Sequence, residues 1–157
     1  MSARILPNEV LPDAFKRLVN LHQHIERTAA EEGLDPVLIE LVKARASQVN
    51  GCAYCTDLHA REGVSHGETA RRLAVLPVWR ETDLFSDQER AALALVEAIS
   101  RLSQTQQVPD EVYAQAAEVF SERQLAVVVW AASLIQVFNG INVAGRKPLP
   151  EEDWSTD

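Results

Sequence analysis

Residues 35–63 read DPVLIELVKARASQVNGCAYCTDLHAREG, and this stretch predicts two helices joined by a tight turn. Pro36, preceded by an aspartate, is typical of a first helical position behind an N-cap. Apolar side chains then recur at helical spacing until Asn50 and Gly51, a pair that favours a turn. We therefore expect one helix to end at this pair and a second helix to begin close to Cys52.

The rest of the chain carries the same helical periodicity, and no clear alternating strand pattern interrupts it. Three serines are each followed three residues later by Glu or Gln, the capping box that marks a helix start. The predicted boundaries are a helix from Pro12 to Gly33, an end of the Cys52 helix at Gly63, starts at Ser65/Glu68, Ser86/Glu89 and Ser121/Gln124, and a shorter helix after Pro109. The predicted fold class is all-α.

The segment from Glu122 to Phe138 is apolar nearly all round. Such a helix is either the centre of a core or a helix partly buried against another subunit, and the sequence leaves both open. The most apolar run, from Leu125 to Phe138, is too short for a bilayer span, so no membrane-spanning helix is expected.

Length and charge narrow the class of protein. The 157 residues fit one domain, which we place at residues 1–145, with an extended or mobile tail at 146–157 that contains two prolines.

The formal charge of −8 and the absence of a basic cluster argue against nucleic acid and anionic membrane as partners. The N-terminus lacks the apolar region of a secretory signal, which favours a cytoplasmic location.

Both cysteines of the chain fall at the start of the second helix of the opening stretch. At 100° per residue, Cys52, Cys55 and His59 occupy an arc of roughly 60° on one helix face. Cys55 and His59 are one turn apart and can touch, whereas Cys52 is two turns from His59. Cys52 instead lies in the first turn, where the helix dipole stabilises a thiolate.

A carboxylate is expected opposite the imidazole. Glu40 lies ten residues before Asn50, and His59 lies eight residues after Gly51. At about 1.5 Å per residue, both are roughly 12 to 15 Å from the turn in a pair of antiparallel helices. The predicted result is a proton relay from Glu40 through His59 to the thiols.

Glu40, Cys52, Cys55 and His59 form a pattern of Glu, eleven residues, CxxC, three residues and His. This pattern resembles the signature of the AhpD-like alkylhydroperoxidase and carboxymuconolactone decarboxylase superfamily, in its short peroxidase-like branch. The segments VWRETDLFSDQERAALALVEAI and WAASLIQVFNGINV are similar too, so that the resemblance covers roughly residues 10–145. It implies an all-helical subunit that assembles into trimers or hexamers.

The resemblance also implies an activity, that of a thiol peroxidase which reduces hydroperoxides through a Cys52–Cys55 disulfide. An external dithiol, thioredoxin-like or lipoyl, would then restore the thiols, and we expect neither cofactor nor metal. The best-characterised peroxidase of the family has histidine where this chain has Tyr54, so a second imidazole is missing and activity is expected to be modest. Tyr54 itself either lines the entrance to the pocket or packs.

Several alternatives stay open at this point. The thiols could be small buried hydrophobic groups, or Cys52, Cys55, His59 and His66 could bind zinc. Cys55 is the expected peroxidatic thiol because it alone reaches His59, although the helix terminus favours Cys52. A redox sensor or dithiol carrier of the same fold would share the disulfide but not the turnover of peroxide.

Other polar residues carry weaker expectations. His22 and His24 are expected to be satisfied or exposed histidines outside the site. Arg45 pairs with an acidic residue across a subunit contact or lies at the surface. Asn139 and Asn142 either donate hydrogen bonds into a neighbouring site or belong to the C-terminal turn of a helix.

Overall fold

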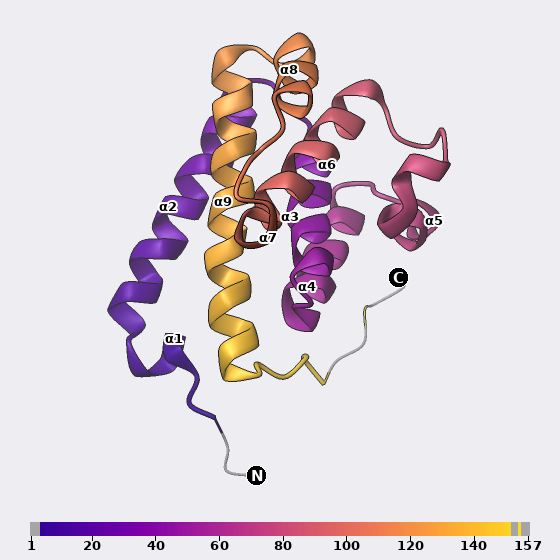
Figure 1. The fold of residues 1–157 in the computed structure, drawn as a ribbon. Helices are drawn as coiled ribbons and strands as arrows, with labels where there is room; N and C mark the ends of the chain where they lie inside the picture. Colours follow the sequence, from indigo (N-terminus) through magenta and orange to yellow (C-terminus); the bar gives the residue numbers. More distant parts are fainter. Residues whose placement is uncertain (1–3, 152–153, 155–157) are drawn as a thin grey trace.

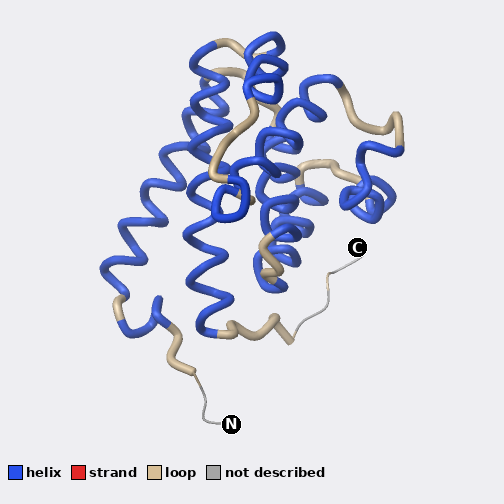
Figure 2. Tube along the Cα trace, in the orientation of Figure 1, coloured by secondary structure: helices blue, strands red, loops and turns tan. Residues whose placement is uncertain are grey.

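The computed structural model describes residues 4–151 and 154, and helices account for all the regular structure in that part of the chain (Figures 1 and 2). The all-α prediction is confirmed. The elements are α1 (Pro7–Val10), α2 (Pro12–Glu31), α3 (Pro36–Val49), α4 (Ala53–Ser65), α5 (Ala70–Val75), the 3-10 helix η1 (Leu76–Glu81), α6 (Asp87–Ser100), α7 (Leu102–Thr105), α8 (Asp110–Val119) and α9 (Glu122–Gly145).

Helix α3 is the centre of the fold. Residues 38–47 are all buried, and α4, α6 and α9 pack around them (Figure 1). The helix begins as expected, because the Asp35 side chain accepts a hydrogen bond from the Val37 amide at 2.9 Å. Because other helices surround α3, its polar side chains point into the interior of the bundle. Glu40, Lys43 and Ser47 are buried in this way.

The turn between α3 and α4 places the cysteines. Gly51 has a φ of +69°, a conformation that glycine adopts without the steric cost paid by other residues. The chain then enters α4 with Cys52 as the N-cap residue. Both cysteines are therefore delivered to the first turn of α4, against the middle of the bundle.

Helix α4 ends two residues later than predicted, and the expected capping box at Ser65 is wrong. Gly67, with a φ of +101°, supplies the left-handed turn, and the Glu68 and Gly67 amides close it on the Gly63 and Val64 carbonyls. The Ser65 hydroxyl donates to a carbonyl of the preceding turn. In the next helix, the side chain of Thr69 is the cap and accepts from the Arg72 amide.

Helix α9 is longer than predicted and does not end at Phe138. It continues to Gly145, where Arg146 adopts a left-handed conformation. By length and composition alone this helix is apolar enough to cross a membrane, contrary to the expectation from the shorter apolar run. Its polar residues Asn139 and Asn142, however, are buried and hydrogen-bonded to α3 and α4, as in the core helix of a globular protein.

One buried ion pair corrects both expectations for Arg45. Its guanidinium is 2.8 Å from the carboxylate of Glu97 on α6, and both side chains are buried within this chain. Trp79 and Arg80 on η1 donate to the same carboxylate, at 2.9 and 2.6 Å. Arg45 therefore ties α3 to α6 and η1, a partnership between distant segments that local periodicity does not reveal.

The predicted tail is described at residues 146–151 and at Trp154, and none of these residues is helical. The indole of Trp154 donates a hydrogen bond to Asp57 of α4 at 2.8 Å. Residues 152–153 and 155–157, to which the same prediction extends, lie outside the described residues.

Candidate active site

The two cysteines are buried free thiols at the N-terminus of α4. Cys52 is the N-cap, and its sulfur accepts a hydrogen bond from the Cys55 amide at 3.4 Å. The two cysteines therefore lie in contact within a single helical turn. Both sulfurs pack in the hydrophobic core, and each also lines a cavity.

Cys55 opens into a cavity of about 210 Å³ between α2, α4 and α9. Its walls are largely apolar, with Phe15 and Val19 from α2, Leu58 from α4 and Phe138 from α9. The polar groups that converge on it are those of His22, Tyr54, Cys55, His59, Glu62, Asn142 and Lys147. An apolar cavity with a few converging polar groups is the usual form of a small-molecule site.

Cys52 lines a different cavity, of about 360 Å³, next to the turn and the end of α9. Tyr54, Asn142 and Lys147 line both cavities and so lie between them. The Lys147 ammonium is 3.8 Å from the centre of the Tyr54 ring, a cation–π contact. The two sulfurs are thus approached from different sides.

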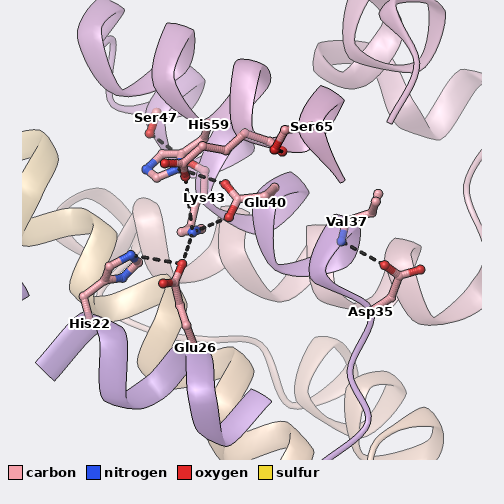
Figure 3. Close-up of polar contacts among 10 residues, drawn as sticks. His22, Glu26, Asp35, Val37, Glu40, Lys43, Ser47, His59 and Ser65 are labelled. Atoms are coloured by element: carbon pink, nitrogen blue, oxygen red, sulfur yellow. Dashed lines mark hydrogen bonds and ion pairs between the residues drawn. The ribbon is translucent and has the colours of Figure 1, made fainter. Parts of the chain in front are cut away.

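The structure brings His59 and Glu40 together. The Nδ1 atom of His59 is 3.0 Å from Oε2 of Glu40, and both side chains are buried (Figure 3). A carboxylate only accepts, so Nδ1 carries the proton. A second carboxylate, Glu62, lies 3.4 Å from the same nitrogen.

A buried lysine that we did not predict completes this cluster. The Lys43 side chain is 1% exposed, and its ammonium is 2.5 Å from Oε1 of Glu40 and 2.7 Å from Glu26 of α2 (Figure 3). Burial lowers the pKa of Lys43, but the opposite effect of the charges of Glu40 and Glu26 is larger in sum, so the pKa is raised. Lys43 holds one oxygen of Glu40 and leaves the other for His59.

Two asparagines of α9 reach the cysteines. The Asn142 amide donates to the Cys55 sulfur at 3.1 Å. Asn139 donates to the Ser47 hydroxyl of α3 at 3.0 Å and accepts from Asn50. Both alternatives stated for these residues hold for Asn142, whose side-chain amide reaches the Cys55 sulfur and whose carbonyl accepts from the Arg146 and Lys147 amides in the last turn of α9. Asn139 lies one turn farther inside the helix.

The hydrogen bonds make the two thiols unequal. The pKa of Cys55 falls to about 6, mainly because the Cys52 thiol donates a hydrogen bond to its sulfur, and burial opposes this shift. The amides of Asn142 and Asn139 and the charge of His59 lower it further. The same hydrogen bond, together with burial, raises the pKa of Cys52 above its ordinary range. These shifts favour Cys55 rather than Cys52 as the thiolate near neutral pH, despite the position of Cys52 at the helix terminus.

Burial lowers the pKa of His59, but the hydrogen bonds to Glu40 and Glu62 outweigh it, so the pKa is raised. A raised imidazole pKa beside a lowered thiol pKa favours the thiolate–imidazolium form of Cys55 and His59. The charge of His59 then stabilises the Cys55 thiolate.

We expect the alkylation rate of Cys55 to rise with pH through a midpoint of about 6, because only the thiolate reacts and this pKa is lowered. About nine-tenths of Cys55 is then ionised at pH 7. In Cys52→Ala the main hydrogen-bond donor is lost and the midpoint should move upward, whereas Cys52→Ser keeps a donor and should move it less. Iodoacetamide labelling followed by peptide mass spectrometry measures these midpoints. Labelling of Cys52 before Cys55 would contradict the assignment of Cys55 as the thiolate.

The carboxylates and imidazole are also the groups that a metal would use. Ligand atoms of Glu40, His59 and Glu62 lie within 4.8 Å of one another. The Lys43 ammonium, however, lies against Glu40 and 4.0 Å from Glu62, so a cation already neutralises these carboxylates. His66, the fourth ligand of the zinc alternative, is at the far end of α4, about 17 Å along the axis from Cys55. The four residues of that alternative do not converge.

Sequence reasoning missed Lys43 and Glu26, whereas His22 is a satisfied histidine, as expected, that also lines the Cys55 cavity. The first two form the ion pair just described, and Nε2 of His22 is 3.1 Å from the Glu26 carboxylate. The available signal was positional, since Lys43 follows Glu40 by about one helical turn in a helix whose apolar side chains recur at helical spacing. In α2, which contains both His22 and His24, no local pattern shows that His22 is the one that faces α4.

The comparisons with known proteins agree with this geometry. The model of the carboxymuconolactone decarboxylase family matches residues 12–98, which include the whole Glu40-to-His59 pattern. The chain belongs to the carboxymuconolactone decarboxylase family. The chain is 34% identical to YdfG of Bacillus subtilis, an uncharacterized protein. The match extends over 144 residues, which are 92% of this chain and 95% of YdfG. YnjA of Escherichia coli, also uncharacterized, is 39% identical over 67 residues, 43% of this chain and 37% of its own length.

Two solved structures share the family fold. ATU0492 from Agrobacterium tumefaciens, a protein of unknown function considered a candidate AhpD antioxidant defence protein, is 32% identical with a TM-score of 0.84 over 96% of this chain and 100% of its own. The debrominase Bmp8 has a TM-score of 0.71 at 20% identity, over 92% of this chain and 74% of its own, and this likeness shows the fold alone. The resemblance to the AhpD-like superfamily is confirmed.

Proposed function

We propose that this protein is a thiol-dependent peroxidase that reduces hydroperoxides through a dithiol–disulfide cycle of Cys52 and Cys55. The observation that carries the proposal is the Cys55 sulfur, with a pKa lowered to about 6, in a largely apolar cavity beside His59. A thiolate is the form of cysteine that attacks peroxides. The likeness to ATU0492 supports the same chemistry.

The cycle has three balanced steps. The Cys55 thiolate attacks the terminal oxygen of ROOH; the S–O bond forms, the O–O bond breaks, and protonation of the departing oxygen gives ROH and a sulfenic acid. The Cys52 thiol then attacks the Cys55 sulfur, which releases water and forms the disulfide. An external dithiol reduces this disulfide to the two thiols and is itself oxidised.

Because the two sulfurs line different cavities, we place the two reactants on different sides. The hydroperoxide enters the cavity at Cys55, where Asn142 and His59 stabilise the thiolate. The reductant approaches Cys52 through the second cavity and attacks its sulfur. A lipoyl or thioredoxin-like dithiol suits this role in the cytoplasm, where thiols are kept reduced. The cytoplasmic location stays a prediction that cell fractionation checks.

Steady-state consumption of an organic hydroperoxide with dihydrolipoamide as the donor tests the proposal. We expect the native protein to complete many turnovers, each forming one alcohol and one oxidised lipoamide. Formation of the Cys52–Cys55 disulfide without sustained turnover would replace this function by the second candidate, a redox sensor or dithiol carrier. The deep burial of both sulfurs is the feature that favours this candidate.

We further propose that the protein is a trimer or hexamer that buries the outer face of α9. Trp130 and Val137 on this helix are 50% and 47% exposed, although its other faces form the core. Apolar side chains repeated along one helix face are typical of subunit contacts. A monomer in light scattering would contradict the assembly.

A further inference from the structure

We infer that His22 of α2 is a second catalytic imidazole, which donates the proton that the departing oxygen of the hydroperoxide needs. This inference rests on the proposed peroxidase function. It assigns a role to a residue outside the CxxC helix, on a helix packed against the other side of the substrate cavity.

His22 lies in the cavity of Cys55. It is one of the residues from α2 that line this cavity, together with Phe15 and Val19, whereas Cys55 and His59 line it from α4. The His22 side chain is 21% exposed, and its ring packs edge-on against Phe138 with centroids 5.6 Å apart. The imidazole is thus partly shielded but still reaches water.

A chain of charged groups fixes His22 relative to His59. Nε2 of His22 is 3.1 Å from Oε1 of Glu26, and the same oxygen is 2.7 Å from the Lys43 ammonium. Lys43 in turn contacts Glu40, which holds His59. Figure 3 shows His22 and Glu26 projecting from α2 toward Lys43, with His59 on the opposite side of that lysine.

The charges around His22 come from three helices and from the segment that follows α9. Glu26 is on α2, Lys43 is on α3, and His59 and Glu62 are on α4, while Lys147 follows α9. The pKa of Glu26 is lowered to about 2, chiefly by its hydrogen bond with His22, so this carboxylate stays anionic at neutral pH. An anion that bridges Lys43 and the imidazole holds the ring in place in either protonation state.

The chemistry calls for a donor opposite Cys55. In a displacement at oxygen, the departing oxygen points away from the attacking sulfur. An alkoxide is a poor leaving group unless it gains a proton as the O–O bond breaks. His59 shares α4 with Cys55 and so lines the cavity from the same helix as the attacking sulfur. His22, on α2, is the imidazole on the other wall of the cavity.

This assignment changes what we expect from the presence of Tyr54 in place of a histidine. The sequence led us to expect modest activity, because the position between the cysteines lacks a histidine. His22 places an imidazole in the same cavity as Tyr54 from a different helix. The second proton donor is then present but comes from α2.

The test compares two oxidants that differ in whether their leaving group needs a proton. Reduced protein is mixed rapidly with tert-butyl hydroperoxide, which releases an alkoxide, or with peracetic acid, which releases acetate. In His22→Gln and His22→Asn we expect the rate with tert-butyl hydroperoxide to fall about 10- to 100-fold, and the rate with peracetic acid to fall less than about 3-fold. His24→Gln, an exposed histidine of the same helix, is the matched control and should change neither rate.

Each outcome decides the inference. Equal slowing with both oxidants would show that His22 only shapes the cavity, and unchanged rates would show that it has no role; either result overturns the inference and leaves the proposed function standing. If the native protein reacts with neither oxidant faster than a free thiol, the proposed function fails, and the role of His22 fails with it.

Discussion

Replacing Cys55 with serine is expected to reduce hydroperoxide turnover to the uncatalysed background, a loss of at least about 1,000-fold. Cys55 is the sulfur that lines the apolar cavity, and its pKa is lowered to about 6. A serine hydroxyl at the same position is not ionised near neutral pH, and the thiol of Cys52 cannot substitute because it lines a different cavity from the one at position 55. Steady-state consumption with a dithiol donor measures the loss.

Cys52→Ser is the matched control for this experiment, since it removes the other sulfur with the same substitution. It keeps the nucleophile, and its hydroxyl can still donate to the Cys55 sulfur. We expect a single burst of one alcohol per chain, followed by arrest because no disulfide forms. The reverse pattern, with a burst in Cys55→Ser and none in Cys52→Ser, would exchange the roles of the two cysteines.

Lys43→Met is expected to destabilise the protein by about 3–5 kcal/mol, the usual cost of removing one partner from a buried ion pair. The Lys43 side chain is 1% exposed, and Glu40, which it contacts, is 6% exposed. Without the ammonium, the Glu40 carboxylate stays buried with His59 as its remaining cationic partner. The midpoint of urea unfolding monitored by circular dichroism measures the change, at constant m-value.

Two further variants show whether the loss comes from the unpaired charge. Lys16→Met changes an exposed lysine of α2 and should alter stability by no more than about 0.5 kcal/mol. The double variant Lys43→Met/Glu40→Met removes both charges and should recover a substantial part of the loss. A single Lys43→Met variant as stable as Lys16→Met would contradict the ion-pair account of this cluster.

The contact between Glu40 and His59 illustrates what could be predicted from the sequence. Helical rise is constant, and a tight turn at Asn50 and Gly51 makes the two helices antiparallel, so counting residues places the two side chains level with each other. The all-helical structure could be predicted equally well, because capping signals and apolar periodicity depend only on neighbours within a few residues.

What could not be predicted depends on packing between distant segments. Lys43 looks like an ordinary polar residue until Glu26 of α2 is placed 2.7 Å from it. His22 shares the apolar stripe of α2, and only the position of this helix against α4 turns it toward the cavity. Likewise, the asparagines near the end of α9 resemble a stop signal, but hydrogen bonds to α3 and α4 keep the helix intact to Gly145.

The most direct test of the central claim is a single turnover of the reduced native protein with one equivalent of an organic hydroperoxide, with alcohol, free thiols and disulfide all quantified. The account predicts one alcohol per chain, loss of both thiols and a Cys52–Cys55 disulfide, at a rate at least about 100-fold above that of a free thiol. Persistence of the hydroperoxide beside two intact thiols, or loss of thiols without an equivalent of alcohol, would contradict it.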